Sequence, residues 1–293
     1  MPPTIHALLA ARLDNLTRAE RAVVEPASVI GLVFAEPAVE AMVPGSLRSS
    51  VRDHLSHLDR KQFVHPLVGE EDPAFRFHHI LVRDAAYQSL LKRARANLHE
   101  QFVAWAEPVN RERGRETEFE EILGYHLEQA VRYRSELGPL DAGGREIALR
   151  AATKLGSAGR RAFARSDLPA AANLLRRAIA LLPDEDVTRL ELLNDLGFVH
   201  FDDGEFAESK AAFHEVEATS ARLENESLRR RASVALGLHA LFGTEVTGNA
   251  AEVLEATRRD VDWFEAEGDA VGLMVGWRLI GRASCRERVW IPV

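Results

Sequence analysis

Apolar residues recur at helical spacing through most of the chain. Between residues 5 and 16 they fall on a single helix face. Thr17 followed by Glu20 has the spacing of a capping box, which predicts the start of a second helix. Further helices are predicted over residues 47–58, 80–105 and 119–134. The pattern therefore predicts a mainly α-helical protein.

A β-type pattern is found only between Gln62 and His78. Two short apolar and aromatic runs, residues 63–68 and 74–78, flank an acidic turn-forming segment at 69–73. This predicts one β-hairpin. Three helices followed by one hairpin is the layout of a winged-helix domain, so we expect a winged-helix-like domain over residues 1–97. Residues 98–144 are then expected to be a helical connector.

The last part of the chain repeats itself, and residues 145–279 are predicted to form a solenoid of helical hairpins. Gly159, Gly197 and Gly237 lie 38 and then 40 residues apart, and small residues there would let two helices approach closely. Polar turns at 166–169 and 202–205 would join the helices of the first two hairpins. The residues expected to pack the repeats are Leu155, Gly159, Ala171, Leu175, Ala178, Pro183, Leu193, Gly197, Phe213 and Gly237.

This stretch resembles tetratricopeptide repeats, with a spacing longer than the usual length of about 34 residues. Another array of helix hairpins is the alternative.

From Ile280 the helical pattern breaks, and the segment resembles the translation of a sequencing adapter. We therefore expect residues 280–293 to be a non-native tail and the third repeat to be cut after Trp277. An apolar face without its neighbour would then be prone to association.

Charge and cysteine content narrow the classes of function. The 293 residues carry 37 Lys and Arg against 45 Asp and Glu, a net charge of −8, which argues against a chain that wraps nucleic acid. The single cysteine, Cys285, excludes a disulfide scaffold and a cysteine-based zinc site. The chain begins without a secretion signal and contains no long apolar run, so a cytoplasmic protein with no membrane partner is expected.

Five histidines within 26 residues are the first candidates for metal chemistry: His54, His57, His65, His78 and His79. The sequence has no HExxH pattern, and neighbouring histidines on a strand point to opposite faces. We therefore favour exposed or hydrogen-bonded histidines and predict no metal ligand.

Motifs for independent catalysis are missing from the sequence. It contains no GxxxxGK[ST], GxGxxG or GxSxG pattern, so we predict no catalytic residue, no enzyme activity and no cofactor for this chain itself. The basic residues Arg83, Lys92, Arg93 and Arg95 could contact DNA. Acidic residues surround them, and a solvated helix face is the favoured interpretation.

Residues 75–90 read FRFHHILVRDAAYQSL and resemble the segment that follows the ATPase core in bacterial STAND-type signalling ATPases. They are most similar to proteins that join a class III adenylate/guanylate cyclase domain, an AAA-like ATPase module and tetratricopeptide repeats. A sister group carries a C-terminal helix-turn-helix regulator instead of the cyclase. Three further stretches resemble the same family: ASVIG at 27–31, LHEQF at 98–102 and GYHLEQA at 124–130. Together the resemblance extends over roughly residues 1–185.

The resemblance implies a non-catalytic regulatory and protein-interaction arm that lies C-terminal to an ATPase core binding ATP or ADP. It implies an intramolecular contact with that ATPase module and a protein or peptide partner in the repeat groove. It also implies that His79, which precedes a helix containing Arg83, touches the phosphate of the bound nucleotide. Ile80 replaces the acidic residue that often follows this histidine in the family. The alternative is that His79 only packs the wing against the next helix.

Two other classes of function stay open. One is a DNA-binding winged-helix regulator with a repeat-based effector arm, which needs a basic recognition helix. Residues 47–58 carry only Arg48 and Arg52 against Asp53, which disfavours it. The other is a stand-alone tetratricopeptide adaptor that grips peptides on its concave face.

Overall fold

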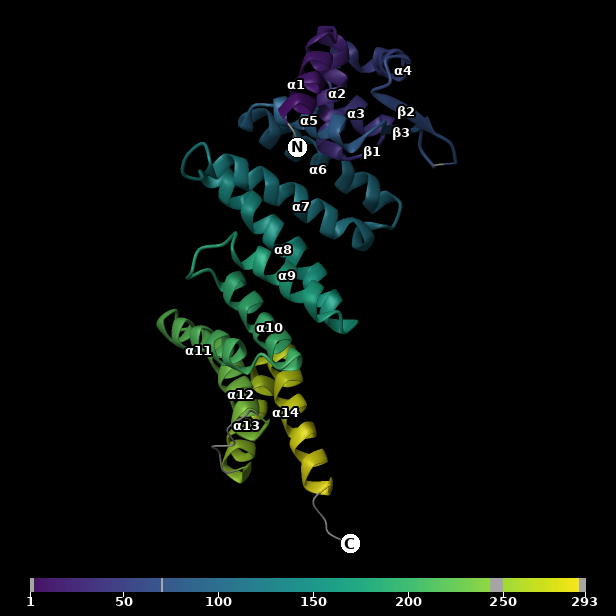
Figure 1. The fold of residues 1–293 in the computed structure, drawn as a ribbon. Coiled ribbons are helices and arrows are strands. Elements are labelled where there is room, and N and C mark those ends of the chain that lie inside the picture. Colours follow the sequence, from purple (N-terminus) through teal and green to yellow (C-terminus); the bar gives the residue numbers. More distant parts are fainter. Residues whose placement is uncertain (1–2, 70, 243–249, 290–293) are drawn as a thin grey trace. The chain divides into compact units, whose positions relative to one another are not determined.

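The computed structural model describes residues 3–69, 71–242 and 250–289. Helices account for most of these residues and accompany one small antiparallel sheet (Figure 1). The prediction of a mainly α-helical protein is confirmed. The chain divides into two compact units, Met1–Lys154 and Leu155–Val293.

The first unit contains a helical bundle around the sheet. Its elements in chain order are α1 (Pro3–Asp14), α2 (Arg18–Ile30), β1 (Val33–Ala35), α3 (Glu36–Met42), the 3₁₀ helix η1 (Gly45–Ser50), α4 (Val51–Arg60), β2 (Val64–Leu67), β3 (Ala74–Phe77), α5 (Ile80–Ser89), α6 (Lys92–Glu112) and α7 (Glu116–Ser135). The helical stretch expected over residues 80–105 is formed by α5 and α6, which are separated at Leu90 and Leu91, and α6 continues across the expected domain boundary at residues 97 and 98.

The predicted hairpin is present as the antiparallel pair β2 and β3, and β1 adds a third strand that was not predicted, in the order β1-β3-β2. β1 pairs antiparallel with β3, with Phe34 opposite Phe75. The sequence did not reveal β1 because it is three residues long and lies between two helices, which leaves no alternation to detect. Phe34 is fully buried and packs against Phe75 and Phe77, so this strand completes the core of the unit.

The predicted capping box is present at the start of α2. Thr17 Oγ1 accepts a hydrogen bond from the Glu20 backbone N–H at 3.2 Å, and a Glu20 carboxylate oxygen accepts one from the Thr17 backbone N–H at 2.8 Å. Lys61, just after α4, donates to the same carboxylate at 2.7 Å. Burial alone would raise the pKa of Glu20, but these hydrogen bonds from Lys61 and Thr17 hold it below its ordinary value. The cap therefore also fastens the end of α4 to the start of α2.

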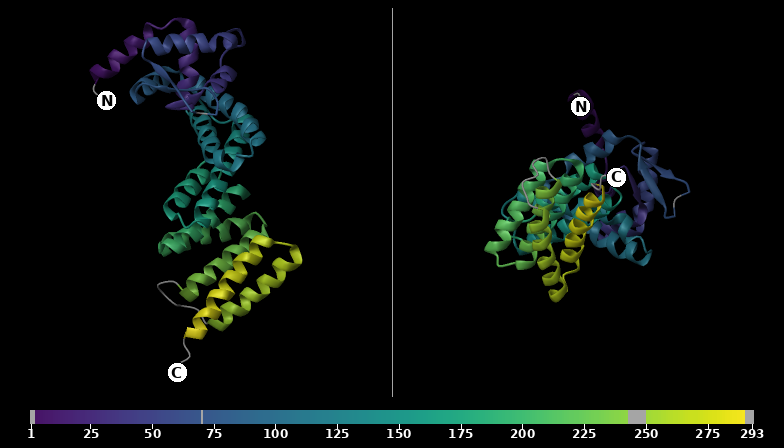
Figure 2. Two further views of the ribbon diagram at one scale, coloured as in Figure 1. Left: turned by 90° about the vertical axis from the view of Figure 1, so that its right-hand side faces the viewer. Right: turned by 90° about the horizontal axis from the view of Figure 1, so that it is seen from below.

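The second unit continues the chain as successive helices. The first of them, α8 (Ala142–Ala164), begins in the first unit and ends in the second. It is followed by α9 (Leu168–Ile179), α10 (Val187–Asp203), α11 (Phe206–Arg222), α12 (Glu226–Phe242), α13 (Ala250–Glu267) and α14 (Ala270–Val289). From α9 to α14 each helix packs against the next, and α12 also contacts α14 (Figure 2). Both expected turns are present: Asp167 caps α9, and Gly204 ends α10 with a left-handed φ of 82°.

The three periodic glycines lie where helices come close together. A Cβ at Gly159 would be 3.0 Å from Leu175 of α9, and one at Gly197 would be 2.5 Å from the ring of Phe213 of α11. At Gly237 it would be 3.0 Å from Leu279 of α14. In each case a side chain from another helix occupies the space that the glycine leaves.

The helix expected to break at Ile280 continues instead to Val289. Leu279 and Ala283 are both buried, which carries the apolar face of α14 four residues further, and Arg282 donates to Asp202 at 3.1 Å. The expected loss of helical pattern is therefore wrong for residues 280–289. The non-native origin of this segment stays a prediction, and the side chain of Cys285 lies outside the described part.

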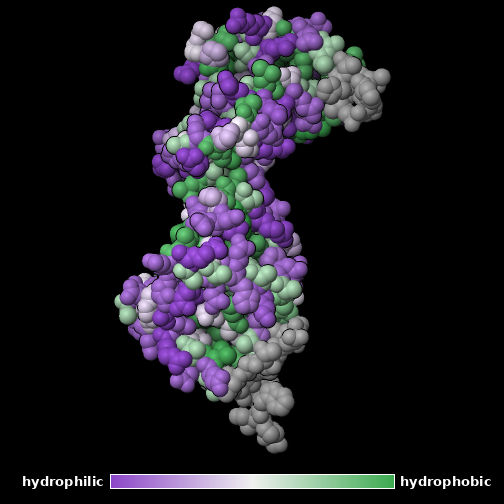
Figure 3. All heavy atoms as spheres, turned by 90° about the vertical axis from the view of Figure 1, so that its left-hand side faces the viewer, coloured by the Kyte–Doolittle hydropathy of each residue, from purple (hydrophilic) through white to green (hydrophobic). Residues whose placement is uncertain are grey.

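Hydrophilic side chains cover most of the face shown in Figure 3, with smaller hydrophobic patches between them. None of the described helices combines enough length with enough apolar character to cross a membrane.

Replacing Gly197 by alanine tests the close contact of α10 and α11. The new methyl group would lie 2.5–2.9 Å from three atoms of the Phe213 ring, so we expect the free energy of unfolding to fall by about 1–3 kcal/mol. Gly281→Ala is the matched control, since a Cβ there meets no described atom within 4 Å and alanine favours a helix. Denaturant unfolding measures both, and Phe213→Leu should rescue Gly197→Ala. Equal stability of Gly197→Ala and the parent would contradict this packing.

Candidate functional site

His79 is the N-cap of α5 and is exposed to solvent. Its Nδ1 accepts a hydrogen bond from the Leu81 backbone N–H at 3.1 Å. The predicted strand therefore ends earlier than expected, since β3 stops at Phe77 and His79 has left the sheet. Because Nδ1 is an acceptor, the neutral ring carries its hydrogen on Nε2.

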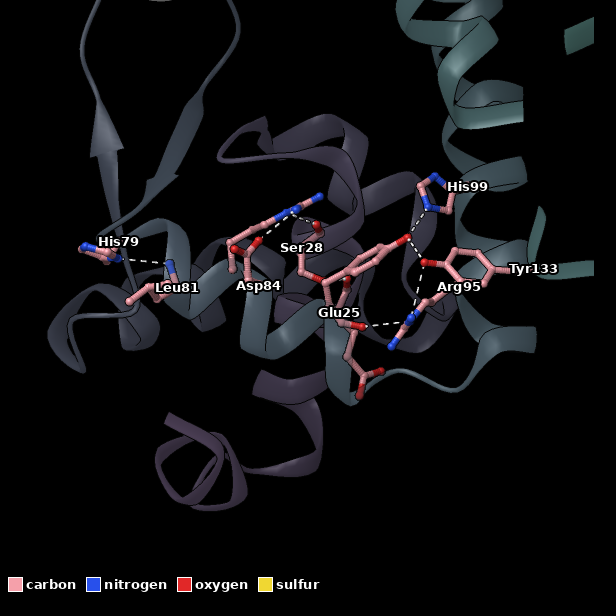
Figure 4. A network of polar contacts seen from close by, with 10 residues as sticks. Glu25, Ser28, His79, Leu81, Asp84, Arg95, His99 and Tyr133 are labelled. Atoms are coloured by element: carbon pink, nitrogen blue, oxygen red, sulfur yellow. Dashed lines mark hydrogen bonds and ion pairs between the residues drawn. The ribbon is translucent and has the colours of Figure 1, made fainter. Parts of the chain in front are cut away.

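Arg83 does not join His79 in a shared site. Its Nε donates to the Ser28 carbonyl of α2 at 2.7 Å, and Nη1 donates to Asp84 at 3.1 Å. The guanidinium also lies over the Tyr87 ring, with its carbon 5.0 Å from the ring centroid. In Figure 4, His79 lies beside Leu81 at the start of α5, whereas Ser28 lies near Asp84 further along. Arg83 thus fastens α5 to α2, and its hydrogen bonds do not involve the imidazole of His79.

Tyr87 is the centre of a polar network between α5, α6 and α7 (Figure 4). Its hydroxyl donates to the Tyr133 hydroxyl of α7 at 3.0 Å and lies 2.9 Å from His99 Nε2 of α6. Burial and the hydrogen bond to Tyr133 raise the pKa of Tyr87, which keeps this hydroxyl protonated. Arg95 donates to the Tyr87 carbonyl at 3.1 Å and to the Tyr133 hydroxyl at 3.3 Å.

The network continues into a buried pair of histidines. His99 and His126 are 0% and 2% exposed, and their Nδ1 atoms are 2.9 Å apart. Because Tyr87 donates to Tyr133, its oxygen accepts from His99 Nε2–H, and His99 Nδ1 must then accept from His126 Nδ1–H. A single direction of donation thus runs from α7 through α6 to α5 and back to α7.

Burial keeps both histidines neutral. Removal from water lowers the pKa of His99 to about 2, and the neighbouring His126 adds to the effect. Burial likewise lowers the pKa of His126 to about 3. A proton on either ring would add a buried charge and break the direction of donation, so the pair acts as a structural connection between α6 and α7.

An ion pair reinforces the same two helices. Arg134 of α7 donates twice to Glu100 of α6, from Nε at 2.6 Å and from Nη2 at 2.9 Å. Such a two-point contact fixes geometry better than a single exposed ion pair.

Each of the four stretches that carry the family resemblance supplies part of this network. Ser28 lies in the first, Arg83 and Tyr87 in the second, His99 in the third and His126 in the fourth. Sequence reasoning selected Arg83 but missed Tyr87, His99, His126, Tyr133 and Arg95 as members of one site. The signal that could have found them was the set of histidines and tyrosines inside those stretches, since such side chains need partners once buried.

The remaining candidates lie elsewhere. Four of the five clustered histidines form two ring pairs, His54 with His57 and His65 with His78, at centroid distances of 6.4 and 4.9 Å. Among the described residues, no group of three or more His, Cys, Asp or Glu side chains is placed to hold a metal ion.

The basic residues near α5 and α6 are not a uniformly solvated face. Arg83 and Arg95 belong to the polar network, and Lys92 pairs with Glu136 at 3.0 Å. Only Arg93 of this group is exposed without an ion pair to a described residue. The solvated-face interpretation is therefore wrong for Arg83 and Arg95. The sequence pattern could not show this, because the hydroxyl and carbonyl groups that accept from these guanidinium groups belong to other segments of the chain.

Most residues expected to pack the repeats are buried in the second unit, whereas Pro183 is exposed in the turn that follows α9. Gly237 is only half-buried. The buried members are Leu155, Gly159, Ala171, Leu175, Ala178, Leu193, Gly197 and Phe213.

Comparison with known proteins adds no relative: no protein-family model and no curated sequence matches the chain.

The buried histidine pair predicts a loss of stability in mild acid. Below a pH of about 6.5 the two histidines take up protons in the unfolded chain. In the folded chain they stay neutral until the pH reaches their folded pKa values, about 2 for His99 and about 3 for His126. Each histidine should therefore lower the free energy of unfolding by up to about 1.4 kcal/mol per pH unit over this window. Above pH 7 the pair contributes no pH dependence, since both rings are neutral in both states.

Denaturant unfolding followed by Trp105 fluorescence measures this slope in a chain whose other three tryptophans, Trp263, Trp277 and Trp290, are replaced by phenylalanine, because Trp105 is the one tryptophan of residues 1–154. His126→Phe should remove about half of the slope between pH 6.5 and 5. His57→Gln is the control, since its exposed imidazole is solvated in both states and the slope should persist. A parent slope that survives in His126→Phe would show that the pair does not carry the effect.

Proposed function

We propose that this chain is the non-catalytic regulatory and protein-interaction arm of a longer signalling ATPase. In this proposal a protein or peptide binds the helical repeats of the second unit, and the first unit contacts an ATPase module that holds ATP or ADP. The two events bias one equilibrium from opposite sides, so each ligand changes the affinity for the other. A cytoplasmic location is part of the same proposal.

The observation that carries the proposal is the orientation of His79. Its Nδ1 is used by the Leu81 N–H, so the free hydrogen-bonding atom of the exposed ring is a donor, Nε2–H. A phosphate oxygen is an acceptor and favours the positive end of a helix such as α5. The helix cap holds this donor in one orientation, which suits a sensor of the phosphates that distinguish ADP from ATP.

The position of α5 supports coupling from this ring to the rest of the unit. His79 begins the helix, Arg83 binds α2 one turn later, and Tyr87 binds α6 and α7 after a further turn. A displacement of His79 would therefore also move the α6–α7 hairpin. Helix α8 follows this hairpin and continues the chain into the second unit. Packed elements joined by hydrogen bonds are the usual carriers of such coupling.

The topology of the first unit favours a winged-helix-like domain. A helix, a strand, two helices and two strands follow one another as α2, β1, α3, α4, β2 and β3, and β1 pairs with β3 at the sheet edge. The second unit favours tetratricopeptide-like repeats, since the periodic glycines of α8 and α10 each contact the second helix of their own hairpin.

The charge on α4 disfavours the DNA-binding alternative. In a winged-helix reader α4 would be the recognition helix, yet Arg52 and Arg60 are balanced there by Asp53 and Asp59. Arg52 is also paired with Glu36 at 2.9 Å. A duplex-binding titration against salt distinguishes the two functions, since phosphate contacts require a steep negative slope.

His79→Ala in the intact ATPase tests the sensor role. If Nε2–H contacts the nucleotide phosphate, the affinity for ADP should fall roughly 10- to 100-fold, as expected for loss of a hydrogen bond to a charged group. Equilibrium titration with fluorescent ADP measures the change.

His79→Asn is the matched variant, because asparagine caps helices well but cannot reach outward as an imidazole does. Both variants should weaken ADP binding if the ring contacts phosphate. If His79→Asn binds ADP normally and His79→Ala binds it more weakly, His79 acts only as a helix cap. If both variants bind ADP normally, the sensor proposal is contradicted.

A further inference from the structure

The first unit contains a cavity that the polar network does not use. Its volume is about 330 Å³, and it lies between β1, α3, α6 and the start of α7. Its walls are mainly apolar and aromatic, with Val33 and Ile122 partly exposed at its mouth. The principal wall residues are Val33, Phe34, Phe102, Trp105, Phe119 and Ile122. This volume is at the lower end of the roughly 300–1,000 Å³ that small-molecule pockets occupy.

Two arginines line this cavity, and they differ in how they are paired. Arg113 is fully engaged, since it donates to both carboxylate oxygens of Asp72 at 2.8 and 3.0 Å. Arg115 has only a looser ion pair, from Nη1 to Glu71 at 3.3 Å, and the Glu71 side chain is 67% exposed. The guanidinium of Arg115 lies over the Phe119 ring, 5.4 Å from its centroid.

The Nε atom of Arg115 is buried and finds no hydrogen-bond acceptor among the described residues. A buried donor without an acceptor is unfavourable, and a guanidinium stays charged at all ordinary pH values. Glu71, which also lines the cavity, shows that a carboxylate reaches this guanidinium at a terminal nitrogen. Because Nε itself is closed to solvent, a ligand carboxylate in the cavity would replace the exposed Glu71 at the terminal nitrogens.

We infer that the cavity binds a small monocarboxylate with an apolar body. The carboxylate would bind the terminal nitrogens of Arg115 in place of Glu71, since guanidinium groups form strong charge-assisted hydrogen bonds with carboxylates. The hydrocarbon part would lie among Trp105, Phe119 and Ile122, where a strongly hydrated anion such as inorganic phosphate finds no partner. This ligand site is independent of the proposed nucleotide contact at His79.

Isothermal titration calorimetry on the full chain with octanoate tests the inference. 1-Octanol is the matched ligand, because it has the same chain length without the charge. We expect saturable 1:1 binding of octanoate that is at least roughly tenfold tighter than that of octanol, since the charged contact is absent for the alcohol. Both ligands are kept below the concentrations at which they self-associate.

Two variants locate the site. Arg115→Gln should weaken octanoate at least roughly tenfold and leave octanol almost unchanged. Arg111→Gln is the matched control, because it removes the same charge from an exposed arginine outside the cavity, and its octanoate affinity should equal that of the parent. Thermal melting of each variant verifies that it is folded.

Three results would overturn the inference: no saturable octanoate binding, octanol binding as tightly as octanoate, or Arg115→Gln binding octanoate like the parent. If Arg115→Gln does not fold, Ala106→Leu replaces it, because a larger side chain on this cavity wall should abolish binding of both ligands. Unchanged octanoate binding in Ala106→Leu would then place the ligand elsewhere.

Discussion

The hydroxyl of Tyr87 holds three helices of the first unit to one another. It joins α5 to α7 through Tyr133 and to α6 through His99, and the carbonyl of the same residue accepts from Arg95. Each partner is itself buried or half-buried, so losing the hydroxyl would leave several polar groups unpaired at once. The arrangement of α5 against the α6–α7 hairpin, and hence the direction in which α5 presents His79, depends on this contact.

Such a network suits a regulatory arm better than a catalytic site. Its histidines are sealed from solvent and held neutral, so they cannot exchange protons with a substrate at neutral pH. What they supply is a defined geometry, because a buried polar network is favourable only when every member has its partner. In the function we propose, that requirement lets α5 and the α6–α7 hairpin respond as one body to a contact at His79.

The sequence predicted what depends on local pattern and missed what depends on long-range pairing. The capping box at Thr17 and the turns at Asp167 and Gly204 follow from spacing and residue type, and all are present. β1 and the partners of Tyr87 were not predictable in this way, because they exist only once segments far apart in the chain meet. Taken one by one, the stretches at 27–31, 75–90, 98–102 and 124–130 do not indicate a shared network, and only the structure shows that they converge on one.

The most direct test is a double-mutant cycle between Tyr87→Phe and His126→Phe, measured by denaturant unfolding of the first unit. Tyr87 and His126 do not contact each other directly, and His99 lies between them, so independent contacts would give additive losses of stability. A single cooperative network predicts a coupling free energy of about 0.5–3 kcal/mol between them. Additivity within about 0.3 kcal/mol would contradict the claim that Tyr87 and His126 belong to one cooperative chain of hydrogen bonds.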